Sequence, residues 1–274
     1  MNKSIITILV ILVFILSGCY NDEKSVLSEI EDDNTQELAD NTAPEVDLEN
    51  LKAEVPILIY HHIREILESD SQNAKTFIVS PNNFEKQLIY LSENNFTSIS
   101  FDNLNDYFEG KFTMPEKPVI ISFDDGVINQ YENALPLLEK YDMNATFFLF
   151  TNPIDKNDNY LNSDQLKEMD KKGMEFGIHG WYHLYLHKEK DEEVLDREII
   201  KSKKLLEEII DKEITAFSYP FGTYLPETIE RIKNTGYFTA RDIINGKIHT
   251  RNDLFTLNGY FITENFSRFK NIVD

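Results

Sequence analysis

Two short segments carry the side chains best suited to chemistry. Asp124, Asp125 and Gly126 come at the end of the apolar run 119–123, and His179 and His183 stand further along the chain. One carboxylate and two imidazoles can hold a divalent ion in three positions and leave a fourth position open for water. The second carboxylate is then free to act as a base on that water. These residue types therefore predict a mononuclear metal hydrolase.

Each segment also has a simpler interpretation when it is taken alone. An aspartate pair before a glycine occurs where a helix begins, because its carboxylates cap free N–H groups. His187 lies four residues after His183 and is a competing ligand. We prefer His179 and His183, because His179 directly follows a predicted strand. If this segment is helical, residues four apart share one face and could bind the same ion.

The surrounding sequence alternates between short apolar runs and amphipathic segments. Ser80 and Pro81 favour a helix start, with serine as the cap and proline at the first helical position. The alternation predicts a parallel α/β domain, as a closed barrel or an open doubly wound sheet. The predicted strands are 55–60, 119–123, 145–150, 174–178, 216–219 and 237–240, and further helices are predicted at 130–141, 163–172, 192–210 and 226–235.

The candidate residues share one position in this pattern, at the carboxyl end of a predicted strand. In α/β barrels that edge is where active sites form, so their common position is stronger evidence than any single motif. The segment Tyr219–Gly222 adds aromatic surface and backbone amides, which suit a sugar ring and a developing oxyanion. No dinucleotide-binding or phosphate-binding glycine motif occurs, so no nucleotide cofactor is expected. The candidates are His61, Asp124, Asp125, His179 and Tyr219.

Charge and cysteine content narrow the function classes. The net charge of -21 argues against nucleic acid as a partner, because phosphates repel such a surface. Cys19 is the single cysteine, so neither an internal disulfide nor a cysteine-rich metal site is expected. Much of the negative charge falls in residues 20–54, which lack a sustained apolar period. That composition is typical of a flexible acidic tether.

The N-terminus is predicted to be a targeting segment. A basic start precedes the apolar stretch 5–16, which is short for a bilayer span and typical of a signal peptide. Leu16–Cys19 resembles the bacterial lipobox, although a signal anchor with an incidental cysteine is the alternative. We predict a signal peptide over 1–18, a lipidated Cys19 with its tether over 19–54, and a catalytic domain over 55–274. Acyl chains on Cys19 would hold the protein at a membrane, facing the extracellular side.

Three segments together resemble the motifs of the polysaccharide deacetylases of the NodB-homology group, carbohydrate esterase family 4. Ser122–Gly126 resembles the first motif, His179–His183 the second and Tyr219–Gly222 the third, within residues 55–240. The resemblance implies a distorted (β/α)7 barrel that binds Zn²⁺ or another divalent ion and acts on an acetylated polysaccharide. It also implies roles: Asp124 as the catalytic base, Asp125, His179 and His183 as metal ligands, and Tyr219, Pro220 and Phe221 as substrate or oxyanion groups, with the backbone amide of Tyr219 at the oxyanion.

Three features depart from the family pattern. Gly180 stands where serine or threonine is usual, and Ser218 stands where an arginine often orients the base. The usual late histidine, the general acid, has no clear match, because His249 has a poor context. The poly-β-1,6-N-acetylglucosamine deacetylase subgroup supplies that acid from a Tyr-His pair after the first strand. Tyr60 and His61 resemble this pair, so the resemblance assigns the general acid to His61.

The implied reaction removes N-acetyl groups from N-acetylglucosamine units of an extracellular or cell-envelope polysaccharide. Poly-β-1,6-N-acetylglucosamine is the favoured substrate, and peptidoglycan is a second one. Two alternatives stay open. An O-acetyl esterase acting on a xylan-like glycan would use the same metal site. An inactive glycan-binding lipoprotein would account for Gly180 and the missing arginine, although retention of all three ligands argues against it.

Overall fold

The computed structural model describes residues 47–274. The predicted signal peptide, Cys19 and the tether up to residue 46 lie outside the described residues. Strand β1 (Lys52–Glu54) pairs antiparallel with β11 (Ile248–Thr250). The folded domain therefore begins before residue 55, because the last residues of the predicted tether hydrogen-bond into a sheet. Between residues 47 and 274, no helix has the length and apolar character needed to cross a membrane.

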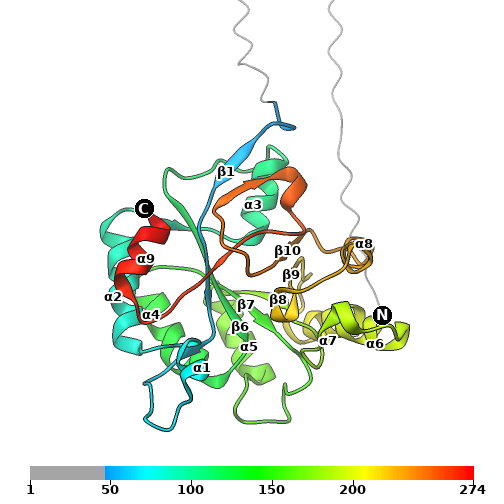
Figure 1. Ribbon diagram of the computed structural model, residues 1–274, viewed down its shortest axis with the longest axis horizontal. Helices are drawn as coiled ribbons and strands as arrows, with labels where there is room; N and C mark the ends of the chain where they lie inside the picture. The colour runs from blue at the N-terminus through cyan, green and yellow to red at the C-terminus, as the bar shows by residue number, and fades with distance from the viewer. Residues whose placement is uncertain (1–46) are drawn as a thin grey trace, which may run out of the picture. The chain divides into compact units, whose positions relative to one another are not determined.

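One curled parallel sheet forms the centre of the domain (Figure 1). Backbone hydrogen bonds join residues 254–257 to β10, and the chain then continues into β12, which pairs with β2. The sheet thus curls into an incomplete α/β barrel, which agrees with the distorted (β/α)7 barrel that the family resemblance implied. In spatial order its strands are β10 (Thr239–Arg241), β9 (Ala216–Ser218), β8 (Glu175–Ile178), β7 (Thr146–Leu149), β6 (Pro118–Asp125), β2 (Ile57–Tyr60) and β12 (Tyr260–Phe261), and β5 (Thr97–Ser98) pairs with the start of β6.

Helices surround this sheet, and α9 lies beside α2 (Figure 1). The side chain of Ser80 accepts the N–H of Asn83, as expected for the predicted cap. Two π-helical turns interrupt predicted helices: η1 (Gln130–Ala134) precedes α4, and η3 (Arg197–Lys201) joins α6 to α7. The α-helices are α1 (Gln72–Lys75), α2 (Pro81–Glu93), α3 (Phe101–Phe108), α4 (Leu135–Lys140), α5 (Ser163–Lys171), α6 (Glu192–Asp196), α7 (Ser202–Ile210), α8 (Pro226–Asn234) and α9 (Phe266–Val273).

Alternate residues of the strands pack on the two faces of the sheet. Ile121 and Phe147 join the larger apolar cluster with the surrounding helices. Ile120 and Phe148 join a second cluster, to which α3 contributes its apolar residues. Side chains two residues apart in a strand share a face, so Asp124 lies on the same face of β6 as Ile120. The buried carboxylate of Asp124 therefore lies on the inner face of the sheet, at the carboxyl end of β6.

Candidate metal and active site

The carboxyl ends of β6 and β8 bring the three predicted metal ligands together. Asp125, His179 and His183 offer ligand atoms that all lie within 4.8 Å of one another. The two Nε2 atoms are 3.1 Å apart, and Oδ1 of Asp125 is 3.7 Å from His183 Nε2 and 3.9 Å from His179 Nε2. Ligand atoms bound at about 2.0–2.1 Å around a tetrahedral ion lie roughly 3.3 Å apart. The three side chains therefore fit one divalent ion.

The protonation states of these groups also suit a metal. Nδ1 of His179 donates to the carbonyl oxygen of Ser218 at 2.8 Å, so its Nε2 keeps a lone pair directed at the cluster. Burial lowers the pKa of His179 to about 3 and also lowers the pKa of His183, so both rings are neutral at pH 7. Burial and the charge of Asp124 raise the pKa of Asp125 to about 7. A bound cation would oppose that rise.

The two histidines meet through an irregular turn, and the helix considered for this segment is not formed. His183 has a left-handed backbone with φ of 60°, and Gly180 has φ of 92°. A left-handed residue other than glycine is uncommon and often marks a functional site. His187 lies outside the cluster, because its Nδ1 pairs with Thr223 Oγ1 at 2.8 Å.

Asp124 is held by an arginine that the sequence interpretation missed. Arg241 ends β10, and it is the residue paired in register with Ser218 on β9. Its Nη2 donates to Asp124 Oδ1 and to Ser218 Oγ, the latter at 2.9 Å. Burial favours a raised pKa for Asp124, but Arg241 and the neighbouring imidazoles outweigh it and lower the pKa to about 2. The neighbouring strand therefore supplies the guanidinium group absent from position 218.

His61 lies just after β2 and lines the same pocket as Asp124. Its ring packs against Phe77 and Phe261, with ring centres 5.0 and 5.4 Å away. Burial lowers the pKa of His61 to about 4, although the charge of Asp124 opposes this shift. The imidazole is therefore neutral at pH 7 in the free protein.

A buried glutamine, also missed from the sequence, connects the two strand ends that carry His61 and Asp124. Nε2 of Gln130 donates to the carbonyl oxygen of His61 at 2.8 Å and to that of Asp124 at 2.6 Å. Gln130 begins the π-helical turn η1, and such turns frequently occur at functional sites. A π-turn cannot be predicted from a helical apolar pattern, so this contact could not be predicted from the sequence.

Two other predicted positions are occupied by structural contacts. His249 is buried on β11, where its Nε2 pairs with the carbonyl oxygen of Val55 at 3.0 Å, and it does not line the pocket. The backbone N–H of Tyr219 donates to the carbonyl oxygen of Arg241 at 3.0 Å. The hydroxyl group of Tyr219 donates to the carbonyl oxygen of Phe255. Assigning the Tyr219 amide to the oxyanion was therefore wrong, because that N–H is already hydrogen-bonded to the end of the neighbouring strand β10.

Phe221 provides an aromatic surface at the rim of the site. Its ring centre is 4.4 Å from that of His183, and the ring also stacks parallel to that of Tyr185, with ring centres 3.7 Å apart. Phe221 is 39% exposed and Tyr185 is 42% exposed, so both rings are accessible to a ligand. Pro220, the preceding residue, is buried.

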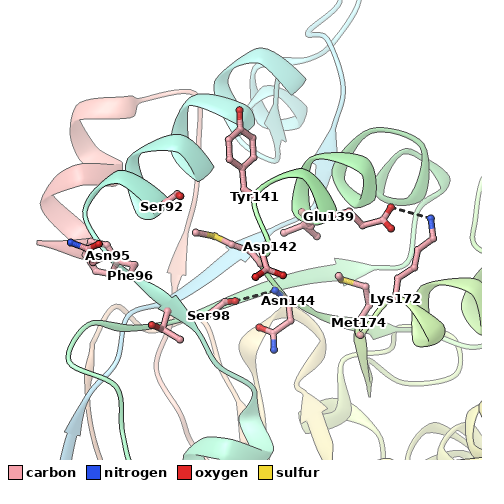
Figure 2. A pocket seen from close by; sticks show the side chains of 14 residues that line it. Ser92, Asn95, Phe96, Ser98, Glu139, Tyr141, Asp142, Asn144, Lys172 and Met174 are labelled. Atoms are coloured by element: carbon pink, nitrogen blue, oxygen red, sulfur yellow. Dashed lines mark hydrogen bonds and ion pairs between the residues drawn. The ribbon is translucent and has the colours of Figure 1, made fainter.

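The candidate residues line a cavity of about 390 Å³. A larger groove of about 770 Å³ lies at the opposite ends of the strands, where α2, α4 and α5 terminate (Figure 2). Figure 2 shows the side chains of Lys172 and Glu139 pointing toward each other on one side of the groove. Their ion pair has an N–O distance of 3.0 Å. None of the candidate residues lines this groove, so we place the chemistry in the smaller cavity. That cavity is lined by His61, Asp124, Asp125, His179, His183, Tyr219 and Phe221, among others.

Comparison with known proteins identifies relatives of this chain. A family model described as polysaccharide deacetylase matches residues 111–240. The YxkH protein of Bacillus subtilis is 31% identical over 185 residues, which cover 68% of this chain and 63% of that protein. The poly-β-1,6-N-acetyl-D-glucosamine N-deacetylase of Staphylococcus epidermidis is 32% identical over 200 residues, which cover 65% of this chain and 68% of that protein.

A solved structure agrees with these relatives. The Streptococcus pyogenes deacetylase PplD, determined in complex with acetate, superposes with a TM-score of 0.76 at 27% identity. The superposition covers 82% of this chain and 100% of PplD. Sequence motifs, fold and relatives therefore agree, and the chain belongs to the polysaccharide deacetylase family, hydrolases of the NodB-homology, carbohydrate esterase 4 type.

Proposed function

We propose that this protein is a metal-dependent N-deacetylase that acts on N-acetylglucosamine units of an extracellular or cell-envelope polysaccharide. The observation that carries the proposal is the convergence of Asp125, His179 and His183 next to the buried carboxylate of Asp124. Zn²⁺ suits a set of two imidazoles and one carboxylate. When bound, such an ion would polarise the acetyl carbonyl and make water more acidic.

The geometry of Asp124 suits a base. Arg241 binds Oδ1, so Oδ2 is the oxygen left to face the ligands, 3.9 Å from His179 Nε2. We assign Oδ2 to accept the proton of the attacking water. His61 would donate a proton to the leaving amine; because it is neutral in the free protein, it would take up that proton from solvent, and Asp124 would return the water proton to solvent after acetate forms. The products would be acetate and a free amine on the sugar.

Poly-β-1,6-N-acetylglucosamine is our first choice of polymer, because the Staphylococcus epidermidis relative is named for that substrate. The exposed rings of Phe221 and Tyr185 support a sugar substrate, since an aromatic face can pack against a pyranose ring. Peptidoglycan contains the same acetylated sugar and is the second choice.

Membrane attachment is a separate part of the proposal. Cys19 lies outside the described residues, and its assignment as a lipidated cysteine depends on the lipobox resemblance of Leu16–Cys19. Lipid attached there would hold the enzyme at the outer side of the cell membrane. Cys19→Ala should move the protein from the membrane fraction to the medium, and an unchanged membrane fraction would contradict the anchor.

Acetate release by the full-length protein tests the activity. Poly-β-1,6-N-acetylglucosamine oligomers, peptidoglycan fragments and O-acetylated xylan would be compared, each with chelator and with added zinc. We expect zinc-dependent release from one of the first two, and loss of that release in Asp124→Asn. Release from xylan alone would identify an O-acetyl esterase. No release by a zinc-loaded protein from any of the three would refute the proposed substrates.

A further inference from the structure

The turn between His179 and His183 is folded around a buried carboxylate. Glu198 is fully buried and belongs to the π-helical turn η3. Its Oε2 accepts the backbone N–H of Trp181 at 2.9 Å, and its two oxygens accept the N–H of Tyr182 at 3.0 and 3.1 Å. A carboxylate from the helical segment that follows the turn thus binds the backbone between the two histidines.

This contact accounts for the unusual glycine at position 180. A Cβ atom added to Gly180 would lie 2.5 Å from Oε2 of Glu198, which is closer than real Cβ contacts. The backbone φ of 92° at Gly180 also disfavours any other residue. The space that a side chain would need at this position is therefore filled by the carboxylate of Glu198.

The opposite side of the turn is also fixed. The carbonyl oxygen of Gly180 accepts the N–H of Thr151 at 3.1 Å, and that of Trp181 accepts the N–H of Asn152 at 3.0 Å. These bonds hold the carbonyl groups, and Glu198 holds the N–H groups. The left-handed backbone of His183 comes directly after this segment, and it is unfavourable for a residue other than glycine. Such a conformation persists only where its surroundings determine it.

We propose that Glu198 is a positioning residue for the metal site. Its carboxylate would shape the turn in advance, so that the Nε2 atoms of His179 and His183 already face each other when an ion binds. This inference rests on the metal site of the proposed function and concerns a group that does not touch the ion. Groups that orient metal ligands in this way typically change metal affinity by about 10–100-fold when they are replaced.

The test is a measurement of zinc affinity in the full-length protein, by competition with a chromogenic chelator. Glu198→Gln keeps the shape of the side chain but replaces one acceptor oxygen with an NH₂ group, so we expect zinc affinity to fall about 10–100-fold. Glu207→Gln is the matched control, because Glu207 lies on the adjoining helix α7 and accepts one backbone N–H, from Ile214 at 3.0 Å. The control should bind zinc as the wild type does.

A second readout separates positioning from the simple loss of a negative charge. Trp181 is the single tryptophan of the chain, so its fluorescence reports the turn itself. Without metal, acrylamide should quench Trp181 more strongly in Glu198→Gln than in the wild type, and added zinc should reduce the difference. Unchanged quenching with weaker zinc binding would overturn the positioning role. If Glu198→Gln does not fold, Glu198→Asp is the second variant. It keeps the negative charge but moves the carboxylate oxygens away from the N–H groups of the turn, so it should still bind zinc more weakly than the wild type.

Failure of this inference can be distinguished from failure of the proposed function. Equal zinc affinity in the wild type, Glu198→Gln and Glu198→Asp would overturn the role of Glu198 and leave the deacetylase proposal intact. Tight zinc binding by the wild type that depends on Glu198, without acetate release, would support positioning and contradict the proposed substrates. A wild type that binds no zinc would overturn both.

Discussion

The pair formed by Arg241 and Asp124 allows a quantitative test of the site. Arg241 is 0% exposed and Asp124 is 2% exposed, so water screens neither charge. The guanidinium also lies over the ring of Phe148, with Cζ 5.0 Å from the ring centre. Arg241→Met keeps an unbranched side chain over this ring and removes the cation. Asp124 then becomes a buried carboxylate without its arginine.

Removing one partner of a buried ion pair typically costs about 3–5 kcal/mol, because the remaining charge is desolvated without compensation. We therefore expect Arg241→Met to lower the free energy of unfolding by about 3–5 kcal/mol at pH 7. In the wild type the pKa of Asp124 is lowered to about 2, so its stabilising contribution is present above the ordinary value of 3.8 and is lost only near pH 2. In the variant, burial raises the pKa of Asp124. The carboxyl group then takes up a proton on acidification, so the loss of stability should be smaller at pH 5 than at pH 7.

Urea unfolding at pH 5 and pH 7, followed by the fluorescence of Trp181, measures this difference. The double variant Arg241→Met with Asp124→Asn buries no unpaired charge, so it should regain roughly 2 kcal/mol over Arg241→Met alone. Acetate release should stay low in both variants, because neither has an oriented base. The reasoning would be refuted if the double variant were as unstable as Arg241→Met and if Arg241→Met lost the same free energy of unfolding at pH 5 and pH 7. The pairing of charges would then not be what stabilises this part of the core.

Burial and the charge of Asp102 raise the pKa of Glu175 to about 7. The folded state therefore binds the carboxyl proton of Glu175 more tightly than the unfolded state does, and the domain should lose stability as pH rises from about 4.5 to 7. Glu175→Gln should remove this pH dependence and stabilise the protein by roughly 1–3 kcal/mol at pH 8 in urea unfolding. His61→Asn should lower kcat for acetate release by about 10²–10⁴-fold with zinc binding retained, whereas His249→Gln should lower only the melting temperature; the reverse pattern would return the acid role to His249. Gln130→Leu removes the donor to the backbone carbonyl groups of His61 and Asp124, so it should lower kcat about tenfold with little change in KM. A change confined to KM would contradict the role of Gln130 in holding the two strand ends.

The strand ends that carry the candidate site were predictable from the sequence. A parallel strand buried on both faces reads as an apolar run, and its end is marked where polar side chains begin. The run 119–123 ends at Asp124, and the run 174–178 ends at His179. The carboxyl ends of parallel strands meet at one edge of a sheet, so residues far apart in the sequence could be placed together. In the structure they line one cavity.

Contacts that depend on strand order and register were not predictable. Arg241 reaches Asp124 because β10 lies next to β9 and pairs Arg241 with Ser218, and no local pattern specifies that neighbour. Strand β12 (Tyr260–Phe261) has only two residues, too few for an alternation to be recognised, yet its pairing with β2 extends the sheet. The turn from His179 to His183 was considered as a helix from its spacing alone, and the left-handed backbone of His183 has no signature in its residue type.

The departures from the family motifs gain a different meaning once these contacts are known. Gly180 and Ser218 gave support to an inactive binding protein, because each replaces a side chain that the family usually has. In the structure, the carboxylate of Glu198 occupies the space beside Gly180, and the guanidinium of Arg241 binds both Ser218 and Asp124. Burying a carboxylate and a guanidinium costs free energy unless each finds partners, so a domain without chemistry has no physical need for either group at these positions. Both departures are thus matched by charged groups from other elements of the fold, and this favours a working hydrolase over a binding module.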